Sequence, residues 1–414
     1  MATPLFFNRK PLPRSATEPM QTRRVVLLSL GHFANDTYHG FLAPLLPMLK
    51  AEIGFSLTLA ALLTSIQAIF NSLSQPLFGH LADKMRNPAM AALGPLITAL
   101  FLGTIGLWNS YAGLALILIL AGLGTAAFHP QAAVLAARAS GRSSATGMSI
   151  FVTGGSAGHA LGPLIILPIV TGLGLEYSPI TIIYGALVSV VLLRSLPRLE
   201  RAPVHHVEPD LLSGLPKGRH RSLLVLWAVV TLRAFLIVAL ITFIPIFLHQ
   251  RNTSLFLSGS AITVFEISGA AGAFCGGYLS DRFGRKLLIL ISFSASLPFL
   301  WLFLSLSGVL AFVSLALGGL ILYSTIPVVI VMAQELFPNR ANTVSSLMMG
   351  VAWGVGGLLV TPFGALADHV GVGPALNALL VVCPVAVFAS LLLTEPRKEV
   401  PAEVEQNARS KKNA

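Results

Sequence analysis

The stretch GYLSDRFGRK, residues 277–286, recurs in a shorter form 198 residues earlier, where GHLADK occupies residues 79–84. Arg142 and Arg340 follow the two copies at the same offset. Several matches at one spacing indicate that a longer unit has been duplicated. The chain is therefore expected to consist of two related halves.

The composition is that of an integral membrane protein. Of the 414 residues, 55% are hydrophobic and only 10% are charged, whereas an ordinary soluble domain has about a quarter of its residues charged. Mostly apolar segments of about 20 residues, the length needed to cross a bilayer, recur along the whole chain. We predict an all-α integral membrane protein with 12 transmembrane helices at residues 25–49, 57–81, 88–108, 111–137, 144–171, 179–196, 222–249, 258–280, 286–306, 308–334, 343–367 and 374–394.

The basic residues lie almost entirely on one side of the predicted bundle. Of the 27 Lys and Arg residues, 24 fall on the side that carries both termini, whereas Lys50 and Arg251 lie on the other side and Arg233 lies inside a span. Because Lys and Arg mark cytoplasmic loops, we expect both termini in the cytoplasm. The net charge of +11 then reflects membrane topology, and no nucleic-acid partner is expected.

The predicted spans divide the chain into five parts. They are a cytoplasmic N-terminal segment (1–24), an N-terminal six-helix half (25–196), a cytoplasmic linker (197–221), a C-terminal six-helix half (222–394) and a cytoplasmic tail (395–414).

This organisation resembles the major facilitator superfamily, whose halves rock about a binding site near the middle of the membrane. GYLSDRFGRK is similar to the loop signature of that superfamily, and it lies between the second and third spans of its half. The first-half copy lacks the later glycine and the basic pair. The resemblance implies a pair of pseudo-symmetric halves that move against each other.

The same resemblance implies a gate at the cytoplasmic ends of the helices. Asp83 would face the start of span eleven near Asn342, and Asp281 would face the start of span five near Ser144, because a carboxylate is favourable at a helix N-terminus. Glu335 could pair with Arg282 or Arg285. The expected gating residues are Asp83, Arg142, Asp281, Arg282, Arg285, Glu335 and Arg340.

The first predicted span contains four polar residues on one helix face. His32, Asn35, Asp36 and His39 follow the spacing i, i+3, i+4 and i+7, which places them on one side of a helix. At about 1.5 Å per residue, Asp36 lies near the centre of the bilayer. This face is expected to line a polar path or to pair with other polar groups.

Ionisable residues occur at similar depth in other spans, namely His129, Arg233 and Glu266. A charge at the centre of a membrane helix costs at least about 2.5 kcal/mol, so these residues require an explanation. One explanation is that Asp36 and Arg233 form a permanent ion pair that holds the halves together. Glu266 has no basic partner in its own span, which makes it the sharper candidate for proton exchange.

We therefore predict that Asp36 and Glu266 couple transport to protons. His159 lies among glycines in span five and is interpreted as a packing residue. The candidate substrate-binding residues are His32, Asn35, His39, His129, Gln131 and Arg233.

Three motifs stand out in the first half, namely His32 with Asn35-Asp36, Phe128-His129-Pro130, and residues 149–164. Together they resemble the fosmidomycin-resistance branch of bacterial efflux transporters. In that branch the Phe-His-Pro motif often continues with a glutamate, where this chain has Gln131. The resemblance implies a protein of the bacterial inner membrane that exports a drug-like or anionic small molecule as protons enter, with Arg233 and the histidines as anion contacts.

Other functions remain open from the sequence. The same buried groups would serve a proton-linked importer of an organic anion, and a non-transporting membrane sensor could share the fold. An enzyme is disfavoured, because we find no catalytic constellation, no metal-ligand cluster and no phosphate-binding glycine loop. Neither a cofactor nor a disulfide is expected. The expected partners are a small-molecule substrate, protons and the lipid bilayer around a monomer.

Overall fold

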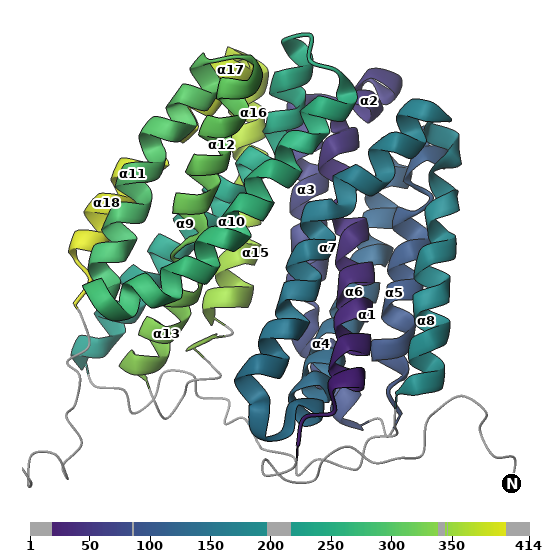
Figure 1. Ribbon diagram of the computed structural model, residues 1–414. Helices are drawn as coiled ribbons and strands as arrows, with labels where there is room; N and C mark the ends of the chain where they lie inside the picture. Colours follow the sequence, from purple (N-terminus) through teal and green to yellow (C-terminus); the bar gives the residue numbers. More distant parts are fainter. Residues whose placement is uncertain (1–18, 85–86, 197–216, 338–343, 346, 395–414) are drawn as a thin grey trace, which may run out of the picture.

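The computed structural model describes residues 19–84, 87–196, 217–337, 344–345 and 347–394. All regular secondary structure in these residues is helical, which confirms the all-α prediction (Figure 1). The first bundle comprises α1 (Thr22–His39), α2 (Leu42–Ile53), α3 (Leu57–Ser72), α4 (Gln75–Lys84), α5 (Ala89–Leu102), α6 (Tyr111–Ser140), α7 (Ser144–Gly172) and α8 (Ile182–Ser195).

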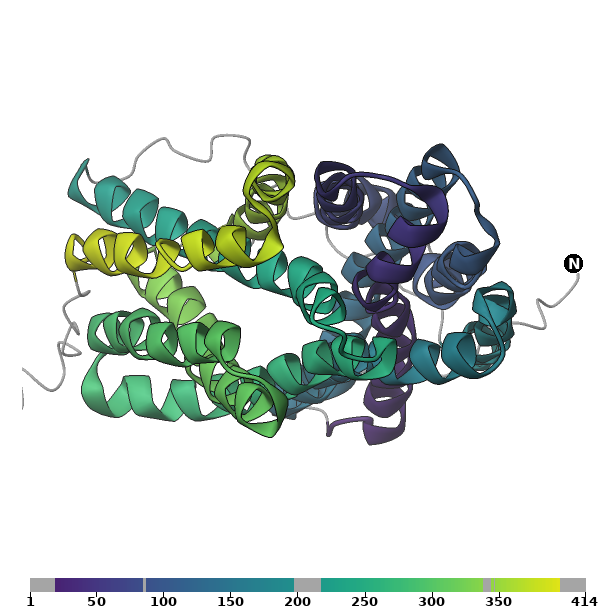
Figure 2. The ribbon, with the colours of Figure 1, turned by 90° about the horizontal axis from the view of Figure 1, so that it is seen from above.

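A second bundle lies beside the first, as the view from above shows (Figure 2). Its helices are α9 (Lys217–Gln250), α10 (Leu255–Phe283), α11 (Arg285–Ser305), α12 (Gly308–Tyr323), α13 (Ile326–Leu336), α15 (Ala352–Leu358), α16 (Val360–Val370), α17 (Val372–Leu379) and α18 (Val382–Leu391), with a π-helical turn at Leu347–Val351 before α15.

The described helices agree with a twelve-span membrane protein. Eleven helical segments, several of which join two neighbouring helices, are long and apolar enough to cross a bilayer. The remaining expected span, 25–49, corresponds to α1 and α2, which are separated by Gly40 and Phe41. This span carries the four residues of the predicted polar face and is not among the eleven.

Several helices differ in their limits from the predicted spans. Span two is broken at Leu73 and Ser74 into α3 and α4, span ten is broken at Ser324 and Thr325 into α12 and α13, and α9 begins at Lys217, before the predicted 222. Residues 1–18, 85–86, 197–216, 338–343, 346 and 395–414 lie outside the described part, and with them most of the expected N-terminal segment, linker and tail.

Helix α1 packs closely on α7 through a row of glycines at four-residue spacing. An added Cβ at Gly154, Gly158 or Gly162 would lie 2.5 Å or less from a backbone carbonyl oxygen of α1. Small residues let two helix backbones approach in this way. The glycine spacing of span five thus serves close packing of α7 against the helix that carries Asp36.

Serine caps fix the starts of three long helices. The hydroxyls of Ser56, Ser110 and Ser254 accept hydrogen bonds from the backbone N–H groups near the beginnings of α3, α6 and α10. Such caps satisfy amide groups that a helix leaves unpaired at its N-terminus. We call the side of the molecule where α1 starts and α18 ends the terminal side, and the other side the opposite side. All three helices begin on the opposite side.

The two bundles are close on the opposite side and diverge toward the terminal side (Figure 1). An added Cβ at Gly364 of α16 or at Gly357 of α15 would lie 2.6 Å from a side chain of α3. At Gly354 the nearest atom is 3.5 Å away, and at Gly350 nothing lies within 4 Å. The contact between span eleven and the first bundle is therefore looser at Gly354 and Gly350, toward the terminal side, than at Gly364 and Gly357.

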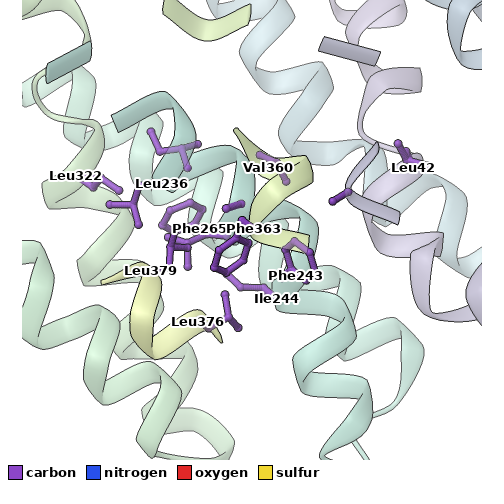
Figure 3. Close-up of a cluster of buried hydrophobic side chains, with 14 of the residues drawn as sticks. Leu42, Leu236, Phe243, Ile244, Phe265, Leu322, Val360, Phe363, Leu376 and Leu379 are labelled. Atoms are coloured by element: carbon purple, nitrogen blue, oxygen red, sulfur yellow. The ribbon is translucent and has the colours of Figure 1, made fainter. Parts of the chain in front are cut away.

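The buried apolar side chains form two clusters. The larger cluster joins both bundles and includes Phe243 and Phe363, whose ring centroids are 5.2 Å apart, with Phe265 beside them in the second bundle (Figure 3). The smaller cluster belongs to the first bundle alone and includes Phe128 and Phe151. Continuous apolar packing between the bundles thus belongs to the larger cluster.

The glycine row predicts a test of the α1–α7 contact. In Gly158→Ala the new methyl group would collide with a carbonyl oxygen of α1, and such overpacking typically costs about 1–3 kcal/mol. We expect the apparent unfolding temperature of the purified protein in detergent to fall by several degrees. Gly172→Ala is the matched control, since nothing lies within 4 Å of the new methyl group; equal unfolding temperatures for the two variants would contradict the packing role.

Candidate functional site

The carboxylate of Asp36 lies between two imidazole rings in the middle of the first bundle. Its Oδ2 is 3.2 Å from Nε2 of His32, and its Oδ1 is 3.1 Å from Nε2 of His129. His32 and Asp36 are one turn apart on α1, whereas His129 comes from α6. The predicted polar face of the first span is therefore completed by a histidine from span four.

The hydrogen bonds of His32 define where its protons lie. Nδ1 is 2.8 Å from the carbonyl oxygen of Phe151, and because a carbonyl only accepts, Nδ1 must carry a proton. The second ring nitrogen then attracts the Asp36 carboxylate only if it also carries a proton, or if the carboxyl group itself does. His32 and Asp36 together thus hold one proton more than a neutral imidazole and a free carboxylate would.

Asn35 orients the Asp36 carboxylate. Its Nδ2 donates to Asp36 Oδ1 at 2.9 Å, and its Oδ1 accepts from the hydroxyl of Thr98 at 3.0 Å. Asn35 is fully buried, so its amide requires these internal partners. The structure places Asn35 as a support of Asp36 instead of at an open surface of the site.

His39 lies one turn further along α1 and joins the network around Asp36 through Thr125, which also bonds Asn35. Its Nε2 is 2.5 Å from the hydroxyl oxygen of Thr125, and its Nδ1 is 2.8 Å from Nε2 of Gln67. Sequence reasoning missed Thr98, Thr125 and Gln67, because single hydroxyl or amide residues in apolar spans carry no spacing signal. Together these side chains join α1, α3, α5 and α6 around the carboxylate.

Glu266 is bonded across the boundary between the two bundles. Nδ1 of His159 on α7 is 2.7 Å and 2.9 Å from the two carboxylate oxygens of Glu266 on α10. Glu266 has only 10% of its side chain exposed, and His159 has 35%. The interpretation of His159 as a packing residue was wrong, since it supplies the basic partner that the span of Glu266 lacks.

Arg233 is buried without a carboxylate partner among the described residues. Its side chain is 2% exposed, one terminal nitrogen donates to the hydroxyl of Thr325 at 3.0 Å, and Nε has no hydrogen-bond partner. Asp36 is bonded to histidines, so the permanent ion pair with Arg233 that we considered is not formed here. Thr325 lies at the break between α12 and α13, a type of site where transporters bind ligands.

The expected substrate contact Gln131 has a structural role in this conformation. Its Oε1 accepts from the backbone N–H of Ala91 at 2.8 Å, and its Nε2 donates to the carbonyl of Asn87 at 3.1 Å. These bonds satisfy backbone groups at the start of α5. With its side chain 2% exposed, Gln131 does not line the site.

The terminal-side charges form one defined pair within the second bundle. Arg285 donates to both oxygens of Glu335 at 2.6 Å and 2.5 Å, which selects Arg285 over Arg282 as the partner. Asp281 is 73% exposed and lies 3.4 Å from Arg285, so it is not buried against α7 in this conformation. The side chains of Asp83, Arg142 and Ser144, and the whole of Arg340 and Asn342, lie outside the described residues.

On the opposite side, Asp368 joins the bundles in a way that the sequence analysis missed. Its carboxylate accepts hydrogen bonds from the backbone N–H groups of Leu57 and Thr58, each at 2.8 Å, and from the Thr58 hydroxyl at 2.5 Å. Asp368 belongs to α16 and therefore caps α3 of the other bundle. A carboxylate at a helix N-terminus is favoured by the helix dipole and by the unpaired amides.

Comparisons with known proteins agree with the fold. A sequence profile of the Major Facilitator Superfamily matches residues 28–361 and 261–412. The chain is 29% identical over 413 residues to the uncharacterized MFS-type transporter YfnC of Bacillus subtilis (strain 168), covering 96% of this chain and 98% of that protein. It is 29% identical over 355 residues to the fosmidomycin resistance protein of Escherichia coli (strain K12), covering 83% and 86%.

A solved structure with a similar fold is the bacterial homolog of the human lysosomal transporter Spinster in an inward-facing and occupied conformation. Its TM-score is 0.77 at 16% sequence identity, and the alignment covers 91% of this chain and 97% of that chain. At this identity the likeness concerns the fold alone.

The Asp368 cap predicts how the opposite side opens. In Asp368→Ala the bundles lose an N-cap, a change that costs about 1 kcal/mol, so the state that is open on this side should become several-fold more populated. Spin labels at positions 173 and 370, in a Cys275→Ser background, should then show a longer distance component. Glu52→Ala is the control, because it removes an exposed carboxylate at the end of α2 on the same side of the molecule. An unchanged distance distribution in Asp368→Ala would contradict this role of Asp368.

Proposed function

The chain belongs to the Major Facilitator Superfamily and is a membrane transporter, not an enzyme, and we propose that it exports an anionic, drug-like small molecule in exchange for protons. The observation that carries this proposal is the bond between Glu266 and His159, which joins a titratable carboxylate of one bundle to an imidazole of the other. Transport by alternating access requires the bundles to change their contact, and this bond makes that contact depend on protonation.

The chemistry of the pair explains the coupling. A charge-assisted hydrogen bond is roughly twice as strong as a neutral one, and it is stronger still in a medium of low dielectric constant. A proton that neutralises Glu266 weakens its bond to His159 and eases the separation of α7 from α10. Loss of that proton restores the bond and favours the closed contact.

Asp36 supplies a second proton-binding position in the first bundle. It shares a proton with His32 and accepts from His129, and none of these bonds crosses to the second bundle. Titration at Asp36 therefore changes the charge of the site without directly breaking the contact between the bundles. We assign proton binding to both Asp36 and Glu266, and the response of the contact between the bundles to Glu266.

Arg233 supports the choice of an anionic substrate. A buried guanidinium without a nearby carboxylate is costly, and an anion bound at the α12–α13 break would compensate its charge. Nε of Arg233 has no hydrogen-bond partner, and one terminal nitrogen donates to the Thr325 hydroxyl, so the guanidinium has a donor available for a bound anion. An arginine of this kind can bind a carboxylate or phosphonate group through two parallel hydrogen bonds.

Export is the direction favoured by the resemblance to the fosmidomycin resistance protein, which spans most of both chains. With the basic side in the cytoplasm of a bacterial inner membrane, the present conformation is closed toward the outside and diverges toward the inside. An exporter in this state would receive its substrate from the cytoplasm. We propose that the chain acts as a monomer, with lipid covering its outer helices.

A transport assay tests the proposal. In inverted membrane vesicles with an acidic interior, addition of fosmidomycin or of an organic-anion panel should cause proton efflux. We expect Glu266→Gln to lower the initial rate at least tenfold, because its amide cannot exchange a proton. Glu52→Gln, which changes an exposed carboxylate at the end of α2, should keep the rate.

The same assay identifies the alternatives. An undiminished rate in Glu266→Gln would show that this acid only stabilises the fold. A silent export assay together with proton-linked uptake of an organic anion in right-side-out vesicles would establish the importer instead.

Arg233 allows a second test that separates binding from stability. Arg233→Gln removes an uncompensated buried charge, so the unfolding temperature should stay constant or rise. The apparent affinity for an anionic substrate should fall about tenfold or more, because a hydrogen bond to a charged group contributes about 1.5–3 kcal/mol. Arg251→Gln, at an exposed site beside Phe247, is the control; a lower unfolding temperature with unchanged affinity in Arg233→Gln would contradict anion binding.

A further inference from the structure

The cluster around Asp36 also has the composition of a metal-ion site. One possible ligand atom each from His32, Asp36 and His129 lies within 4.8 Å of the other two. No metal-ligand cluster was expected from the sequence, because the third ligand, His129, is 93 residues from Asp36 in the chain. Two imidazoles and one carboxylate are a donor set that several divalent transition metals accept.

The distances between the donor atoms fit coordination without a large rearrangement. Metal–ligand bonds of about 2.0–2.1 Å in tetrahedral geometry place neighbouring ligand atoms about 3.3 Å apart. Nε2 of His32 lies 3.2 Å from Oδ2 of Asp36, and Nε2 of His129 lies 3.1 Å from Oδ1, so each imidazole nitrogen has one carboxylate oxygen at close to this spacing. A small outward movement of the three side chains would therefore make room for an ion between them.

The surroundings hold the ligands in the orientation that a metal ion requires. Metal-binding histidines usually donate their other ring N–H to a carbonyl or carboxylate, and Nδ1 of His32 does so toward Phe151. Asn35 donates to the Asp36 carboxylate. Gln75 lies 3.3 Å from Nδ1 of His129, and a turn of its amide would present an oxygen acceptor there.

One face of the cluster remains open. The side chains of His32, Asp36 and His129 are 12%, 18% and 21% exposed, which leaves an approach for an ion and a place for a further ligand. Gly155 of α7 provides the space beside His32, since a Cβ there would lie 2.3 Å from Nε2 of the ring. A larger residue at this position would displace the ring without removing any ligand.

The donor set selects the class of ion. Mg²⁺ and Ca²⁺ prefer an all-oxygen environment, whereas imidazole nitrogen suits Zn²⁺ and its neighbours in the first transition series. We propose that His32, Asp36 and His129 bind one divalent transition-metal ion of the Zn²⁺ class. This binding goes beyond the proposed proton-coupled export, because it requires no transport and replaces the shared proton of the cluster.

Equilibrium binding of Zn²⁺ to the untagged full-length protein in lipid nanodiscs tests the proposal. Titration calorimetry should show one ion per chain, and His129→Gln should lower the affinity at least 100-fold. Gly155→Ala keeps all three ligands and should still lower the affinity about tenfold or more, because second-shell changes commonly have effects of this size. Both variants are compared after their elution profile and unfolding temperature have been matched to those of the parent protein.

Two controls separate this site from other histidines and from general packing effects. His205→Gln/His206→Gln removes the adjacent histidines between the halves, and Gly172→Ala adds a methyl group to the same helix without a contact. Both should keep the affinity of the parent protein. Any of three results would overturn the proposal: no Zn²⁺ binding by the parent protein, equal affinity in His129→Gln, or loss of binding only in the His205/His206 variant. The vesicle assay tests proton-coupled export independently of these results.

Discussion

The structure depends on how a carboxylate is stabilised where bulk water is absent. In the interior of a membrane protein every buried polar group needs a partner from the chain itself. Asp36 obtains its partners from His32, Asn35 and His129. These partners fix the positions of α1 and α6, so the helices around the carboxylate are arranged as much by polar bonds as by apolar packing.

The two bundles differ in the partners that they provide for their buried ionisable side chains. The first bundle collects an acid, three histidines and several hydroxyls into one connected network. The second bundle contains a buried cation, Arg233, whose bonds are incomplete, and an acid, Glu266, whose partner comes from the first bundle. The two halves therefore share an architecture but differ in their buried ionisable residues. They are joined by the bond between His159 of α7 and Glu266 of α10.

The sequence predicted the helical fold and the polar face of α1, because these features follow from local periodicity along a helix. It did not predict which residues face each other. Depth led us to consider Asp36 with Arg233, whereas helix rotation and packing pair Asp36 with His32 and His129 and Glu266 with His159. Asp368 was missed because its partners are backbone amides of a helix 310 residues away, which leave no mark in the sequence.

The glycine row of α7 has a mechanical consequence. Because backbone meets backbone at Gly154, Gly158 and Gly162, α1 and α7 form a single stiff unit. Within this unit, the Phe151 carbonyl of α7 accepts the Nδ1 proton of His32. On the same helix, His159 bonds Glu266 of the second bundle. A tilt that separates α7 from the second bundle therefore also moves α1 and Asp36. The two acids are connected mechanically, through the packed helix pair, and not through a chain of hydrogen bonds.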